Sequence, residues 1–133
     1  MKVVSHNHCR SALGYHFVFV TKRRNRIFSG KVEAALKRVL SEISDANGYD
    51  IELAGVDGDH VHVFVTAPPS VDPSEIARRL KGATSRRMRQ IFSWLDQRLP
   101  GGSLWSPSYF VASVGALSEG AMRRYIAAQG RTA

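Results

Sequence analysis

The stretch YDIELAGVDGDHVHVFVTA, residues 49–67, decides the fold predicted for this chain. Its two halves, 49–56 and 60–67, are rich in β-branched and aromatic residues, and the polar turn Asp-Gly-Asp at 57–59 separates them. Two such runs joined by a short glycine-containing turn are typical of a β-hairpin. The sequence therefore predicts two antiparallel strands here.

Further elements are predicted on both sides of this hairpin. Residues 12–21 and 109–115 are rich in aromatic and β-branched residues and are predicted to form strands. Apolar residues recur at helical spacing over 31–47, and a capping-box pattern starts a second helix at Asp72 that extends to about Phe92. The resulting order is β-α-β-β-α-β.

This order is that of the ferredoxin-like α+β fold, an antiparallel sheet with two helices on one face. We expect a short additional helix at 118–129. Because alternate side chains of a strand point to opposite faces, the valines of the second hairpin strand would pack against the helices. His60, His62 and Phe64 would then lie on the open face of the sheet.

Composition and charge limit the class of protein. The 133 residues fit one domain, in which residues 1–11 form a polar, flexible lead-in. The 19 Lys and Arg against 11 Asp and Glu give a net charge of +8, which favours nucleic acid as partner and an anionic membrane second. With no run of 18 apolar residues and no P-loop motif, we expect no membrane partner and no nucleotide cofactor. The single cysteine, Cys9, fits a reducing compartment, so we expect a cytoplasmic protein.

The two histidines at 60 and 62 are the first candidate site. Imidazole is the commonest metal ligand in proteins, and this pair stands on one face of a strand. On the pair alone, two packed or surface histidines are the better interpretation, because the pattern is short and a metal site needs a third donor.

The segment RRYIAAQ, residues 123–129, is the second candidate. Tyr125 and Gln129 are four residues apart and share one helix face, where the tyrosine alone is better interpreted as a packing anchor. The functional alternative makes Tyr125 a nucleophile and the side-chain carbonyl oxygen of Gln129 a third metal ligand. A phenol, with a pKa of about 10, is more acidic than a sugar hydroxyl, so a DNA phosphotyrosine is a reactive ester. A DNA 3′-hydroxyl could attack this ester and rejoin strands without ATP.

Arginines gather on one side of the predicted helix IARRLKGATSRRMRQIF, residues 76–92. No acidic residue follows Glu75 until Asp96, so we expect this stripe to lack internal neutralisation and to bind phosphate. With the basic segment KRRNR at 22–26 and the pair before Tyr125, the candidate DNA-binding residues are Arg23, Arg24, Arg78, Arg79, Arg86, Arg89, Arg123 and Arg124.

The chain resembles the TnpA-type single-tyrosine HUH transposases of small bacterial insertion sequences. The resemblance extends over roughly residues 12–129, and its motifs occur in the family's order: DHVHVFV, LKGATSRRM, LWSPSYFVASVG and RRYIAAQ. One departure is Gly58, where many members have proline.

The resemblance implies a metal-dependent enzyme that cleaves and rejoins single-stranded DNA at insertion-sequence ends. It implies His60 and His62 as the HUH pair, Gln129 as the third ligand of Mg²⁺ or Mn²⁺, and Tyr125 as the nucleophile that forms a 5′-phosphotyrosine. The expected partners are single-stranded DNA with hairpin ends and a second copy of the chain. In such a homodimer we expect composite sites, with the histidines from one chain and the tyrosine helix from the other.

Two other interpretations remain open from the sequence. One is a single-stranded nucleic-acid binding module without catalysis, in which Tyr125 forms no covalent adduct. The other is a domesticated, repeat-associated tyrosine transposase that serves its host rather than a mobile element.

Overall fold

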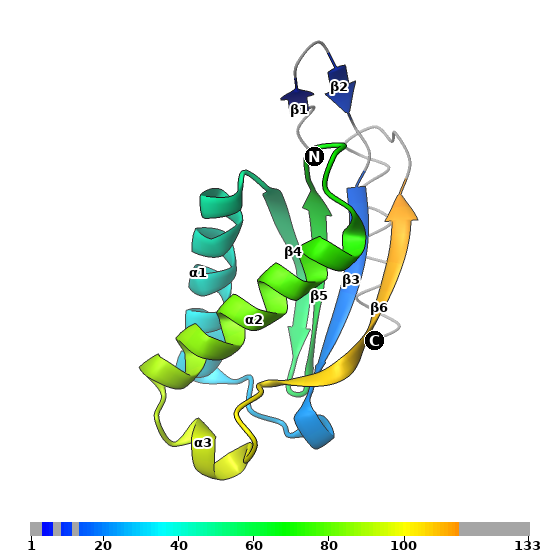
Figure 1. Cartoon of the computed structure of the whole chain (residues 1–133). Coiled ribbons are helices and arrows are strands. Elements are labelled where there is room, and N and C mark those ends of the chain that lie inside the picture. Colours follow the sequence, from blue (N-terminus) through cyan, green and yellow to red (C-terminus); the bar gives the residue numbers. More distant parts are fainter. Residues whose placement is uncertain (1–3, 7–8, 12–13, 115–133) are drawn as a thin grey trace.

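A four-stranded antiparallel sheet with two long helices forms the body of the molecule (Figure 1). The computed structural model describes residues 4–6, 9–11 and 14–114, so the predicted helix 118–129 lies outside the described residues. The sheet has the order β4-β5-β3-β6, and its strands are β3 (Gly14–Thr21), β4 (Asp50–Asp57), β5 (His60–Thr66) and β6 (Trp105–Val114). The helices are α1 (Gly30–Asn47), α2 (Pro73–Ile91) and the short α3 (Leu95–Arg98).

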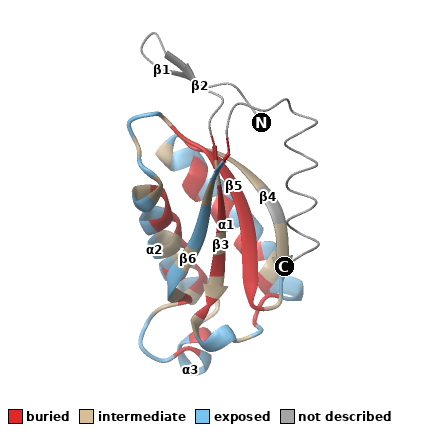
Figure 2. Cartoon of the chain, turned by 90° about the vertical axis from the view of Figure 1, so that its right-hand side faces the viewer, coloured by how far each residue is buried: buried red, intermediate tan, exposed pale blue. Residues whose placement is uncertain are grey.

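This arrangement confirms the predicted ferredoxin-like α+β fold. Helices α1 and α2 lie on the same side of the sheet (Figures 1 and 2). No described helix combines the length and the apolar character that crossing a bilayer requires.

The two long helices begin and end where the local chemistry predicts. The side chain of Asp72 accepts a hydrogen bond of 2.9 Å from the backbone N–H of Glu75, and Pro73 occupies the first turn of α2. At the end of α1, Gly48 adopts a left-handed conformation with φ of 73°, which glycine reaches without steric cost.

The core lies between the sheet and the two helices. Phe17 and Phe19 of β3 and the three valines of β5 face apolar side chains from α1 and α2, which include Val32, Leu36, Val39, Leu40, Ile43, Ile76, Leu80 and Met88. The prediction that the valine face of β5 packs on the helices is therefore confirmed. All seven residues of β5, which lies between β4 and β3, are buried (Figure 2).

The opposite face of the sheet differs from the prediction. In the register of β3 and β5, Val20 stands opposite His60, Val18 opposite His62 and His16 opposite Phe64. The histidines share one face, as predicted, but His60 is only 7% exposed and His62 only 6%. The expectation of an open face was therefore wrong at this point, because both rings are almost completely buried.

The start of β6 also differs from its prediction. Strand β6 begins at Trp105, before the predicted strand 109–115, and Trp105 pairs with Thr21. The buried indole of Trp105 donates a 2.9 Å hydrogen bond to Thr84 of α2, so this part of the strand is anchored to the core. Within the expected lead-in 1–11, the strands β1 (Val4–His6) and β2 (Cys9–Ser11) pair antiparallel.

Candidate functional site

The rings of His60 and His62 stand side by side at the start of β5, with their centroids 5.3 Å apart and their planes at 74°. Each ring is held through Nδ1. For His60 the partner is Oδ1 of Asp59 at 2.7 Å, and for His62 it is Nε2 of His16 at 3.0 Å. The two Nε2 atoms are buried and have no hydrogen-bond partner among the described residues.

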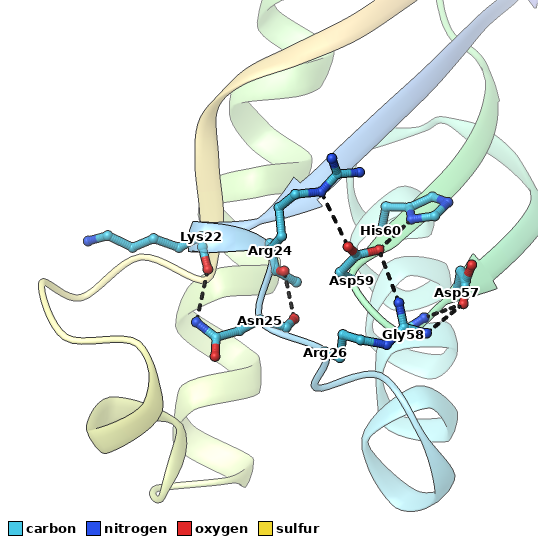
Figure 3. Close-up of polar contacts among 9 residues, drawn as sticks. Lys22, Arg24, Asn25, Arg26, Asp57, Gly58, Asp59 and His60 are labelled. Carbon is cyan, nitrogen blue, oxygen red and sulfur yellow. Dashed lines mark hydrogen bonds and ion pairs between the residues drawn. The ribbon is translucent and has the colours of Figure 1, made fainter.

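Asp59 connects the histidine pair to the basic segment that follows β3. Its backbone carbonyl accepts a hydrogen bond from the N–H of Thr21 at 2.9 Å, and its carboxylate contacts Arg24 Nε at 3.3 Å and Arg26 Nη1 at 3.9 Å (Figure 3). The hydrogen bond with His60 is the largest influence that lowers the pKa of Asp59. The carboxylate is therefore ionised at neutral pH and accepts the Nδ1 proton of His60.

The turn before the histidines brings the backbone of Gly58 close to the side chain of Arg26. A Cβ atom at Gly58 would lie 2.7 Å from the guanidinium group of Arg26. The same guanidinium contacts Asp57 Oδ1 at 3.2 Å, so it lies across the turn (Figure 3). A side chain or a proline ring at position 58 would displace Arg26 from this place.

Burial keeps His16 and His62 uncharged at neutral pH. It lowers the pKa of His16 to about 4, with the neighbouring His62 adding to the effect. Burial also lowers the pKa of His62 below its ordinary value of 6.5, and the nearby His60 contributes in the same direction. At neutral pH these two imidazoles are neutral, and neutral imidazole is the form that binds metals.

The donor set fits part of a metal site. Two buried Nε2 atoms on one strand face, each on a ring that is oriented through Nδ1, are the arrangement that metal-binding histidines show. Among the described residues no group of three His, Cys, Asp or Glu side chains could hold a metal. The histidine pair needs a further donor, and the predicted donor, Gln129, lies outside the described residues together with Tyr125, Arg123 and Arg124.

The arginines of α2 are more neutralised than the sequence predicts. Glu75 contacts Arg79 at 2.8 Å and Arg78 at 3.9 Å, and Asp96 contacts Arg89 at 2.9 Å. The expectation of a stripe without internal neutralisation was therefore wrong for these three arginines. Arg86 is exposed and has no ion-pair or hydrogen-bond partner within the described part of the chain.

A groove of about 760 Å³ lies between α2 and β6, on the helix side of the sheet. Its basic lining comes from Arg78, Lys81, Arg86 and Arg89, and its aromatic lining from Trp105 and Tyr109. The ammonium group of Lys81 donates to the backbone carbonyls of Ser106 at 2.7 Å and Pro107 at 3.2 Å, and lies 5.5 Å from the ring centre of Tyr109. The groove and the histidine pair occupy opposite faces of the sheet.

Of the remaining predicted DNA-binding residues, Arg23 and Arg24 lie in η1 (Lys22–Arg24), directly after β3. Both have positive φ angles, 57° and 54°, which are uncommon for residues other than glycine. The side chain of Arg24 is 73% exposed although it contacts Asp59. It therefore retains donors that point to solvent beside the histidine pair.

Comparison with known proteins identifies the family. A sequence model of the IS200-like transposases matches residues 9–129. The chain belongs to this family. The match includes the histidine pair, the groove and the segment that carries Tyr125 and Gln129.

Individual relatives agree with this assignment. The chain is similar to the ISDra2 transposase TnpA of Deinococcus radiodurans, with 34% identity over 117 residues, 88% of this chain and 84% of the relative. A crystal structure of a candidate transposase from the same species has a TM-score of 0.71 at 35% identity, covering 87% of this chain and 89% of that one. A REP-associated tyrosine transposase bound to a REP hairpin has a TM-score of 0.58 at 15% identity, covering 95% of this chain and 68% of that one. This last similarity concerns the fold alone.

Sequence reasoning missed two residues that the structure places in the site. Asp59 directly precedes the histidine pair, and its position next to His60 was a signal that the sequence offered. His16 is 46 residues away from His62, and only the pairing of β3 with β5 brings the two rings together.

Proposed function

We propose that this transposase is a metal-dependent enzyme that cleaves and rejoins single-stranded DNA through a 5′-phosphotyrosine. The observation that carries the proposal is that the Nε2 atoms of His60 and His62 are buried and have no hydrogen-bond partner in the described part of the chain. A buried polar atom without a partner is costly, so such atoms call for a functional explanation. A shared metal ion that takes both lone pairs would provide it.

In this proposal His60, His62 and Gln129 hold Mg²⁺ or Mn²⁺. When bound, such an ion supplies positive charge that polarises the scissile phosphate. Mg²⁺ prefers oxygen ligands, so the side-chain oxygen of Gln129 and water would complete the set, while Mn²⁺ accepts imidazole more readily.

Tyr125 is the proposed nucleophile. Its phenol gives up a proton and its oxygen forms a bond to the scissile phosphorus. The bond from phosphorus to the 3′ oxygen breaks, and the leaving oxygen takes up a proton to become a 3′-hydroxyl, so the step is balanced. Rejoining is the reverse reaction, in which a 3′-hydroxyl attacks the phosphotyrosine. It needs no nucleotide cofactor, because the phosphotyrosine ester conserves the energy of the phosphodiester bond that was broken.

Two surfaces support DNA binding. The groove between α2 and β6 combines four basic side chains with two aromatic ones, a combination that suits a phosphate backbone. On the histidine face, Phe110 is 55% exposed and its ring packs edge-on against His16, with 6.2 Å between ring centres. An unpaired base could stack on Phe110 close to the histidine pair.

We propose a homodimer as the active form. Strand β6 pairs with β3 on one side and has no second strand partner among the described residues. It carries the exposed side chains of Phe110 and Val111, and exposed edge strands with apolar residues favour association with another chain.

The test of the chemistry uses single-stranded DNA hairpins, Mg²⁺ and a denaturing gel that detects a covalent protein–DNA adduct. Wild-type protein should form the adduct, and a chelator should abolish it while leaving DNA binding. Tyr125→Phe keeps the ring and removes the hydroxyl, so it should bind hairpins and form no adduct. An adduct with Tyr125→Phe would refute the assignment, and binding without any adduct would favour the non-catalytic module.

The test of the composite site is complementation. A chain with both His60→Ala and His62→Ala is mixed with a Tyr125→Phe chain under conditions that allow subunits to exchange. If the histidines and the tyrosine of one site come from different chains, cleavage reappears from two inactive parents. Continued inactivity after proven exchange would refute the shared arrangement during cleavage.

A further inference from the structure

His16, in the middle of β3, lies against the histidine pair without belonging to the HxH motif. It stands opposite Phe64 in the register of β3 and β5, and its ring therefore lies diagonal to that of His62 on the same face. The residue is fully buried, with an exposed fraction of 0%. A polar ring in such a place needs specific partners.

The contact between the two rings is close and well aligned. Nε2 of His16 lies 3.0 Å from Nδ1 of His62, the ring planes are within 17° of each other, and the ring centres are 5.2 Å apart. At this distance one proton lies between the two nitrogens. With two protons two donors would face each other, and with none two lone pairs would face each other.

This proton can belong to either ring, and the choice decides what His62 offers at Nε2. If His16 donates, the proton of neutral His62 lies on Nε2, where a buried N–H has no acceptor among the described residues. Orphaned buried N–H groups are rare. If His62 donates from Nδ1, its Nε2 carries a lone pair instead and His16 accepts.

We infer that His16 is a positioning residue that holds His62 in the form protonated at Nδ1, so that Nε2 of His62 presents its lone pair to a metal ion. Asp59 serves His60 in the same way, since its ionised carboxylate accepts only. Both rings then present the lone pair of Nε2 to a metal ion. Both are also held at Nδ1 by a second residue, as metal-binding histidines commonly are.

The geometry separates this role from that of a third ligand. The Nε2 atom of His16 faces Nδ1 of His62 and not the two Nε2 atoms where a metal would bind. Within the described residues, the three histidines do not form a group able to hold a metal. His16 therefore acts through His62.

The inference rests on the proposed metal site, but its first test needs no metal. Two-bond ¹H–¹⁵N correlation spectra of the metal-free, full-length chain report which ring nitrogen of each histidine carries the proton. The signals of His62 are identified by their absence in His62→Ala. We expect the proton of His62 on Nδ1, and a proton on Nε2 in the wild-type chain would overturn the inference.

The second test compares two substitutions by Mn²⁺ binding, measured from the electron paramagnetic resonance signal of free Mn²⁺. His16→Phe keeps an aromatic ring but accepts no hydrogen bond, and it should weaken Mn²⁺ binding about 10- to 100-fold. His16→Gln retains an acceptor oxygen and should recover most of the lost affinity. Circular dichroism and metal-free hairpin binding check that both variants are folded.

The outcomes separate this inference from the proposed function. If folded His16→Phe binds Mn²⁺ within twofold of the wild-type chain, or if His16→Gln is as weak as His16→Phe, the positioning role is refuted. If the wild-type chain itself binds no Mn²⁺, the proposed metal site fails, and the position of the proton on His62 still decides the role of His16.

Discussion

Replacing Asp59 by alanine tests how the histidine pair is supported. The substitution removes the carboxylate that accepts from His60 Nδ1 at 2.7 Å and that also contacts Arg24 and Arg26. A hydrogen bond to a charged group contributes about 1.5–3 kcal/mol. The two arginine side chains are 73% and 66% exposed, so each ion pair adds well under about 1 kcal/mol. We expect the free energy of unfolding to fall by about 2–3 kcal/mol, a loss dominated by the bond to His60.

The functional effect is expected to exceed the effect on stability. Without Asp59, the imidazole of His60 is free to rotate and to carry its proton on Nε2, which blocks that atom as a ligand. Loss of such a supporting partner commonly weakens metal binding about 10- to 100-fold, or about 1.4–2.8 kcal/mol. Urea denaturation measures the stability, and titration with Mn²⁺ monitored by electron paramagnetic resonance measures the affinity.

Asp57→Ala is the matched control. Asp57 contacts Arg26 at 3.2 Å from the same turn, and although it stands opposite His60 in the register of β4 and β5, its carboxylate makes no hydrogen bond to the ring of His60 among the described residues. We expect this variant to bind Mn²⁺ like the wild-type chain. If Asp59→Ala is destabilised but binds Mn²⁺ within twofold of the wild-type chain, the carboxylate only supports the turn, and the reasoning about His60 is refuted.

Three further predictions concern other parts of the molecule. Thr84→Val removes the acceptor of the buried Trp105 N–H and should lower the free energy of unfolding, measured by urea denaturation, by about 1–3 kcal/mol. Thr84→Ser keeps the acceptor and should lower it little, and equal stability of all three chains would contradict the role of this bond. The hydrogen bonds from Ser74 and from the Glu75 N–H lower the pKa of Asp72 below 3.8, so the stability that its carboxylate contributes is fully present above pH 3.8 and is lost as the pH falls through the lower folded pKa. The melting temperature of Asp72→Ala should therefore lie below that of the wild type at pH 7 and approach it in acid, while Asp72→Asn keeps a cap at every pH; a gap that stays constant in acid would refute the titration. Arg86→Gln should reduce the slope of log affinity for DNA against log salt by about one, and Arg87→Gln, which removes an arginine that contacts Glu42, should not; equal slopes would remove Arg86 from the DNA interface.

The spacing of apolar residues along the chain predicted the helices and strands well, because this spacing depends on local backbone geometry. The two-residue repeat of β5 placed His60 and His62 on one face, and the capping residue Asp72 marked the start of α2. Both features are decided by neighbours within four residues. For the same reason the sequence could identify the valine face of β5 as the face that packs on the helices.

Contacts between distant segments could not be predicted in the same way. The register of β3 against β5, which brings His16 to His62, follows from the packing of the whole sheet. The partner of Arg87 is Glu42 on the neighbouring helix, and no spacing along α2 reveals it. The predicted strand began at residue 109, but an edge strand tolerates a proline such as Pro107, and β6 starts at Trp105.

The position of the two histidines on β5 has a consequence for motion. Strand β5 is paired on both sides and buried throughout, so its amide protons should exchange with solvent only when the whole sheet opens. The spacing between the two Nε2 atoms is then nearly constant over the lifetime of the folded molecule. In the proposed metal site, any change in geometry during the reaction must then come from the groups that approach the histidines, while the two rings keep their positions.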